Sequence, residues 1–251
     1  IIERVNPNMI KKLLNHSNFD LLKSYTHEGN LKTVNDITKT QNNDPTIGFE
    51  LKHGNWDSVK ELVFWLESDE YSYNILSSKL SESALFGYSL GYFYCGVSDS
   101  YSKNYYFVFD KNEDEIFLIH WDSDASFGRA WDGEQQDAST LICIPEFNGI
   151  TQKTKENPEW KSEMMEQFSE IFDSYCFEQN LLNKIDSLET LLKYETIENL
   201  DIWMEFFSKD IENDYWNLLS SNPETIWKKE LELIRNFIKG RRDVINDYFN
   251  E

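Results

Sequence analysis

The chain has 251 residues, of which 40% are hydrophobic and 15% aromatic, and 45 acidic against 24 basic residues give a formal net charge of -21. This apolar content excludes a disordered chain and suffices for one large domain, or for two lobes sharing a cleft, without disulfides. The negative charge disfavours anionic partners, so we expect no nucleic-acid binding. No apolar run approaches the roughly 20 residues that span a bilayer, so we expect no membrane span.

The first 55 residues are predicted to form small-sheet and loop material. A short helical pattern covers 8–14, and polar residues with Asn43-Asp44-Pro45 interrupt the extended stretch that follows. The chain starts at Ile1 with neither an initiator Met nor a signal-peptide pattern. We therefore expect a trimmed chain in which the targeting segment is not present.

Helical patterns follow this region. Apolar positions within 59–66 recur at helical spacing and predict a helix capped by Asp57 or Ser58. A second helix is expected from Ser81-Glu82 to about Cys95. Beyond Pro145 the chain is predicted to be helical, in segments near 160–175, 185–194, 197–208 and 225–249.

Two short β-prone runs, Tyr105–Phe109 and Ile116–Ile119, flank a polar turn at 111–114. We predict that they form an antiparallel hairpin. Asn104 lies just before the first strand, and Asp122 follows the second. Because antiparallel strands of similar length return to their starting edge, Asn104 and Asp122 should lie at the same end of the hairpin.

Two further acids are expected at this edge: Asp99, one tight loop before Asn104, and Asp124. The hard oxygen ligands of these four residues suit Mg²⁺ or Mn²⁺ rather than zinc, and a phosphate-bound metal is the natural occupant. The order Asp, four residues, Asn, hairpin, Asp is also that of protein kinases. Taken singly each motif is common by chance, and the alternative for Asp124 is a cap for the turn after it.

Two motifs resemble those of the CotH spore-coat kinases, a family of atypical protein kinases. They are Gly-x-x-Asp-x4-Asn-Tyr-Tyr at 96–106 and Trp-Asp-x-Asp-x-x-Phe-Gly at 121–128. Weaker likenesses occur at 1–5, 29–32, 49–52 and 234–249.

The resemblance implies an α+β, protein-kinase-like fold. Residues 1–55 would be the remainder of an N-terminal lobe, a small sheet region that is incomplete at its start. Residues 56–251 would be a mainly helical C-terminal lobe that carries the catalytic loop and the metal-binding β-hairpin. A spore-coat, cell-surface or extracellular location is also implied.

The implied activity is transfer of the γ-phosphoryl group of ATP to Ser or Thr of a partner protein, with Mg or Mn as cofactor. Asp99 looks like the catalytic base, and Asn104 and Asp122 look like metal ligands. Asp124 matches the second acidic position of the family and is expected to assist with metal. The His and Arg that precede the catalytic Asp of ordinary kinases are replaced here, so no relay of that type is expected.

Phosphate binding in so acidic a protein needs local cations, of which the metal is one. Lys32 in GNLK and Lys52 in FELK are the candidates for contacting phosphate, the alternative for each being an exposed lysine at a strand edge. Lys103, inside the loop, and Arg129, after the second acidic run, are further nucleotide-binding candidates, although charged loop residues are usually just exposed.

Two other functions stay open at this stage. One is a catalytically weak, kinase-like surface or spore-coat interaction protein. The other is a metal-dependent hydrolase that uses the same carboxylates to activate water.

Overall fold

The computed structural model describes residues 5–32, 44–81, 83–97, 102–130, 134–139, 148–155, 157–174, 178–207 and 222–250. The fold is α+β, with a small antiparallel sheet and a mostly helical C-terminal region. In chain order the elements are α1 (Pro7–Leu14), β1 (Phe19–Ser24), β2 (Phe49–His53), α2 (Asp57–Leu66), α3 (Tyr73–Lys79), the π-helical turn η1 (Ser83–Gly87), α4 (Tyr88–Cys95), β3 (Tyr105–Asp110), β4 (Glu115–His120), α5 (Gly149–Lys155), α6 (Pro158–Ser174), α7 (Glu178–Phe207) and α9 (Pro223–Asn250).

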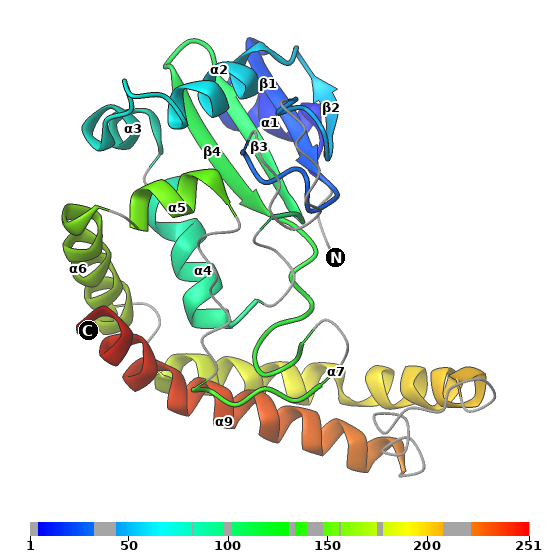
Figure 1. The fold of residues 1–251 in the computed structure, drawn as a ribbon. Coiled ribbons are helices and arrows are strands. Elements are labelled where there is room, and N and C mark those ends of the chain that lie inside the picture. The colour runs from blue at the N-terminus through cyan, green and yellow to red at the C-terminus, as the bar shows by residue number, and fades with distance from the viewer. Residues whose placement is uncertain are drawn as a thin grey trace. The chain divides into compact units, whose positions relative to one another are not determined.

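The sheet has four antiparallel strands in the order β2-β1-β3-β4 (Figure 1). The predicted hairpin is confirmed: β3 and β4 pair over their full lengths, from Tyr105 opposite His120 to Asp110 opposite Glu115. Strand β1 pairs with β3 over six residues and with β2 on its other side. The hairpin therefore extends the N-terminal sheet rather than standing apart from it.

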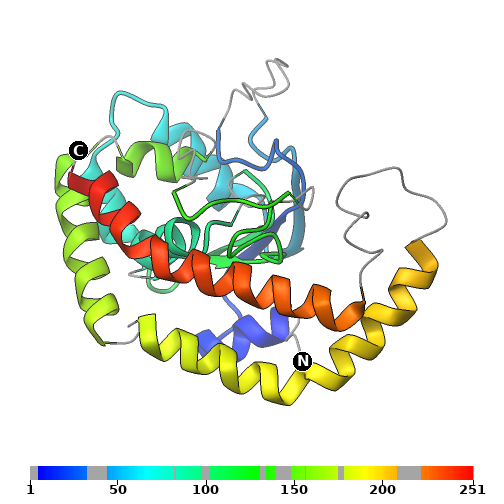
Figure 2. The same ribbon diagram turned by 90° about the horizontal axis from the view of Figure 1, so that it is seen from below.

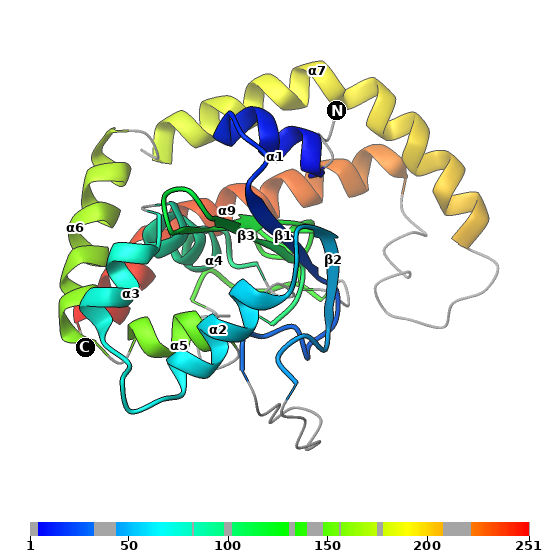
Figure 3. The ribbon, with the colours of Figure 1, turned by 90° about the horizontal axis from the view of Figure 1, so that it is seen from above.

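Helices cover both faces of this sheet (Figure 3). Helix α1 begins with Pro7 after the cap residue Asn6, whose side-chain oxygen accepts hydrogen bonds from the amides of Asn8 and Met9. The core on its side of the sheet contains Val5, Ile10, Phe19, Leu21, Tyr106 and Val108.

Helix α2 buries the apolar positions predicted for it, Val59, Leu62, Val63 and Leu66. Its expected cap is wrong, because the N-cap residue is Trp56, which makes no side-chain cap bond. The Ser58 hydroxyl instead donates a hydrogen bond to the buried carboxylate of Asp20 in β1. Ser58 is thus engaged in a tertiary hydrogen bond, while the side-chain oxygen of Asn55 accepts from the Asp57 amide at the start of the helix.

The C-terminal helices are longer than predicted. Residues 178–207 form one helix, α7, where the sequence suggested two, and no Gly or Pro interrupts that range. Helix α9 begins at Pro223, and Figure 2 shows it running alongside α7. None of the helices in the described ranges is long and apolar enough to cross a membrane.

Contacts divide the chain into two compact units. Unit 1 contains Ile1–Asp124 and Ile142–Met164, and unit 2 contains Ala125–Leu141 and Met165–Glu251. The boundary expected at residue 55 rests on the resemblance to kinases, and it stays a prediction. Packing groups the hairpin with the N-terminal strands because β1 lies directly beside β3.

Candidate functional site

The open end of the β3–β4 hairpin brings the predicted residues Asn104 and Asp122 together. Beyond the last strand pair, the amide of Trp121 donates a hydrogen bond of 2.9 Å to the carbonyl oxygen of Asn104. The ladder thus continues by one pair, and Asp122 is the next residue along the chain. The geometric prediction that these two residues share one end of the hairpin is confirmed.

Both residues leave the strands in the left-handed conformation, with φ of 60° at Asn104 and 58° at Asp122. Asn and Asp tolerate this region better than other residues with a Cβ, because their short polar side chains can bond locally. The backbone therefore turns away from the ladder on both strands. Asn104 is 8% exposed, and its backbone amide donates a hydrogen bond to the carbonyl oxygen of Ser24 at the end of β1.

The carboxylates of Asp122 and Asp124 are exposed. Neither makes a hydrogen bond or an ion pair within the described part of the chain. The Ser123 hydroxyl between them is buried and has no hydrogen-bond partner there either. Together with the side-chain oxygen of Asn104, these hard oxygen atoms are of the kind that suits Mg²⁺ or Mn²⁺.

The predicted ligand set is not complete within the described ranges. Asp99, the expected base, lies outside the described residues. Among those residues, no group of three or more His, Cys, Asp or Glu side chains is placed to hold a metal ion. Metal ligation by Asn104, Asp122 and Asp124 therefore stays a prediction.

A loop that follows β1 reaches the same end of the sheet, which the sequence did not indicate. The buried Ser24 hydroxyl lies 2.9 Å from the carbonyl oxygen of Gly29 and 3.2 Å from that of Ser102. The Tyr105 hydroxyl donates to the same Gly29 oxygen at 2.6 Å, and burial raises the pKa of Tyr105 well above its usual value. These bonds fasten the loop to the end of β1 and to Tyr105, the residue directly after Asn104.

His27 is a site residue that sequence reasoning missed. Its ring nitrogen Nδ1 lies 2.6 Å from the hydroxyl oxygen of Ser102, two residues before Asn104. The two residues are 75 positions apart, and no motif marks either of them. Only the pairing of β1 with β3 brings them together.

The first residue of helix α5 contacts this loop at Asn30 and Leu31. The Gly149 amide donates to the carbonyl of Asn30 at 2.8 Å, and a Cβ at Gly149 would lie only 2.1 Å from the carbonyl oxygen of Leu31. Leu31 has φ of 60°, an uncommon value for a bulky residue. A glycine is thus required for helix and loop to approach this closely.

Comparison with known proteins assigns the chain to a family. The CotH kinase protein family matches residues 1–245. The chain belongs to this family. The match covers both the sheet and the helical region, and it supports the kinase-like fold. A comparison with curated proteins finds no match.

The cations predicted for this CotH kinase chain lie in different places. Lys32 lies in the segment after β1, where its backbone amide donates to the side chain of Asn30, and Lys103 directly precedes Asn104. Lys52 lies on the edge strand β2, separated from β3 by β1, and its ammonium pairs with Glu50 at 2.6 Å. Lys103 is therefore next to the Asn104 end and Lys52 is not, and a contact of any of the three with phosphate stays a prediction.

Arg129 belongs to unit 2. Its guanidinium forms a two-pronged ion pair with Glu230 of α9, with 2.8 Å between Nε and Oε2. This geometry is typical of a strong arginine–carboxylate pair. A contact between Arg129 and nucleotide stays a prediction.

Proposed function

We propose that this CotH kinase chain transfers the γ-phosphoryl group of ATP to Ser or Thr of a partner protein, at a spore coat or cell surface. Family membership supports a kinase-like function. The observation that carries the proposal is the open end of the hairpin, where Asn104 directly precedes β3 and Asp122 and Asp124 follow β4. Neither carboxylate has a hydrogen-bond or ion-pair partner in the described ranges. Kinases hold their metal with an amide and a carboxylate in this chain order.

In the proposed reaction, the acceptor hydroxyl oxygen attacks the γ-phosphorus. The bond from that phosphorus to the bridging oxygen breaks, and ADP leaves with the electron pair. Asp99 orients the hydroxyl and takes its proton. Lys32 and Lys103 would offset phosphate charge.

Asn104, Asp122 and Asp124 would hold the divalent ion, which supplies positive charge beside the phosphates when bound. The left-handed conformation limits which residues can serve at 104 and 122. A residue at position 104 must therefore both adopt a positive φ and offer an oxygen atom to the ion. Substitutions at this position can separate these two requirements.

The test uses ATP labelled on its γ-phosphate, Mn²⁺ and a mixed Ser/Thr peptide library. Asp99→Ala should lower peptide labelling by at least about 100-fold, the usual effect of losing a positioned base, and keep the thermal shift induced by ATP and Mn²⁺. Asn104→Gly should keep the fold, because Gly adopts positive φ freely, and lose labelling and the Mn²⁺-dependent shift. Asn104→Ala should also lose stability.

Three outcomes would contradict the proposal. Wild-type labelling by Asp99→Ala would remove that residue from the reaction. Free phosphate without labelled peptide would indicate a hydrolase. A wild-type chain with no thermal shift in ATP and Mn²⁺ would indicate a kinase-like interaction protein without turnover.

A further inference from the structure

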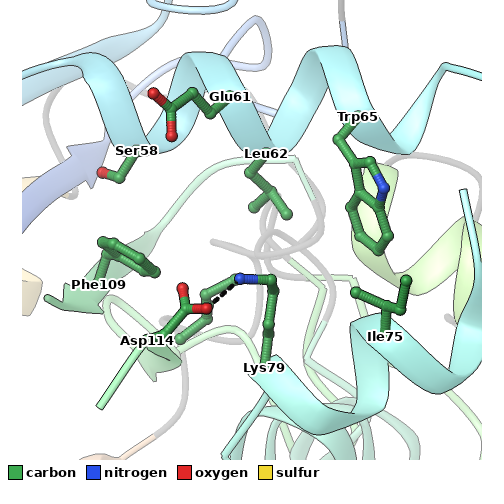
Figure 4. Close-up of a pocket in the computed structure, with 9 residues that line it drawn as sticks. Ser58, Glu61, Leu62, Trp65, Ile75, Lys79, Phe109 and Asp114 are labelled. Atoms are coloured by element: carbon green, nitrogen blue, oxygen red, sulfur yellow. Dashed lines mark hydrogen bonds and ion pairs between the residues drawn. The ribbon is translucent and has the colours of Figure 1, made fainter. Parts of the chain in front are cut away.

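A second candidate site lies in unit 1 at the opposite, turn end of the hairpin. Here α2, α3 and the β3–β4 hairpin enclose a pocket of about 220 Å³ (Figure 4). The apolar part of its lining is formed by Leu62, Trp65, Ile75, Phe109 and Ile116, and the polar part by Ser58, Glu61, Lys79 and Asp114. A strand of six residues, roughly 20 Å, separates this end from Asn104. The pocket is therefore separate from the candidate phosphotransfer site.

The size of the pocket limits its occupant. Sites for cofactors and drug-sized molecules usually occupy roughly 300–1,000 Å³. A pocket of about 220 Å³ is instead suited to one large side chain that enters from outside. Ile75 contributes to the lining and is 46% exposed, so the apolar wall reaches the surface.

The charges around the pocket determine which residues of a ligand could flank that side chain. On one wall the Lys79 ammonium is paired with the Asp114 carboxylate. On the α2 wall the exposed Glu61 carboxylate has no ion-pair partner in the part of the chain that the structure describes. The rim thus carries one uncompensated negative charge.

The hairpin turn adds to this negative field. Burial first, and then the charges of Asp110 and Glu113, raise the pKa of the Glu115 carboxyl. The cation in the turn, Lys111, is already paired with Asp20. A ligand with positive charge beside its apolar group would therefore complement this surface.

We propose that the pocket binds a segment of a partner protein in which one large apolar side chain, Phe or Leu, is flanked by Lys or Arg. The apolar side chain would contact Trp65 and Ile75, and a flanking cation would pair with Glu61. The proposal concerns binding alone and does not depend on phosphoryl transfer. Its failure is thus distinguishable from failure of the proposed activity.

The test measures anisotropy of a fluorescein-labelled peptide, one Phe flanked on each side by two Lys, titrated with the full chain. Glu61→Lys should weaken binding about five- to ten-fold, because it replaces an attraction by a repulsion. Ile75→Ser should weaken binding by a similar factor, and its exposure in the free chain makes the fold tolerant of the change.

Matched controls lie in or close to α2, outside the pocket lining. Glu70→Lys makes the same charge change at an exposed position, and Phe64→Ser removes an apolar side chain of α2 that is 51% exposed. Both should bind the peptide as the wild type does. A peptide with Ser in place of Phe, or with Glu in place of Lys, should bind at least ten-fold more weakly.

Three results would overturn the proposal. The first is equal affinity of the Glu61 and Ile75 variants and their controls. The second is equal binding of the Phe and Ser peptides, which would indicate attraction by net charge alone. The third is no measurable binding of the Phe peptide to the wild-type chain.

Discussion

The ion pair between the buried Asp20 and the partly exposed Lys111 should lose more stability when the lysine is removed than when the carboxylate is neutralised. Asp20 is fully buried in β1, and its oxygens accept hydrogen bonds from the Ser58 hydroxyl at 2.7 Å and the Asn55 amide at 2.8 Å. Lys111 Nζ lies 2.7 Å from the same carboxylate, and the lysine side chain is 28% exposed. The pair joins the central sheet to the start of α2 and to the hairpin turn.

The two halves of this pair differ in what remains after substitution. Lys111→Met leaves a buried carboxylate without its cation, a situation that costs about 3–5 kcal/mol of unfolding free energy. Asp20→Asn leaves an ammonium that can turn toward water, so we expect a smaller loss of about 2–3 kcal/mol. The double variant should lose less than the sum of the two, with a coupling of at least about 1 kcal/mol.

Urea unfolding, combined with hydrogen exchange of β1 and β3 amides, measures these losses and assigns them to unit 1. Lys52→Met is a closely matched control, because Lys52 is also 28% exposed but pairs with Glu50, which is 54% exposed. The control should change stability by less than about 1 kcal/mol. A loss of unfolding free energy in Lys111→Met no larger than that in Lys52→Met would contradict this prediction, as would additive losses in the double variant.

Three further predictions concern other parts of the fold. Burial lowers the pKa of His120 from 6.5 to about 4, so unit 1 should lose up to about 1.4 kcal/mol per pH unit as the pH falls through this window, and His120→Phe should flatten that slope in urea titrations. Gly149→Ala should lower stability by about 1–3 kcal/mol in thermal unfolding, because its Cβ meets Leu31, and an unchanged melting temperature would contradict this. Arg129→Gln and Glu230→Gln should each cost unit 2 about 0.5–1 kcal/mol and should not be additive in hydrogen exchange of α9.

The hairpin and the meeting of Asn104 and Asp122 at its open end could be predicted from sequence because their contacts are local. Two short β-prone runs of similar length and the polar turn between them fix which ends meet. Asn104 and Asp122 thus come together through a segment of fewer than twenty residues. The α2 pattern was equally local, and its buried positions agree with the structure.

The remainder of the site depends on pairing between distant segments, which a single sequence does not specify. The loop after β1 reaches Asn104 only because β1 inserts between β2 and β3. The contact of His27 with Ser102 has no sequence signal for the same reason. Likewise, the position of Lys52 away from the site follows from strand order rather than from its motif.

Pairing with basic groups distinguishes the aspartates of this sheet. At the turn end Asp20 and Asp114 each pair with a lysine, and Asp110 pairs with a histidine. At the open end Asp122 and Asp124 have no such partner within the described ranges. A carboxylate already held by a protein cation must give up that partner before it can bind a metal, whereas an uncommitted carboxylate loses only water. Net charge therefore could not point to a candidate cation site in so acidic a chain, whereas the uneven distribution of basic partners along one hairpin favours its open end.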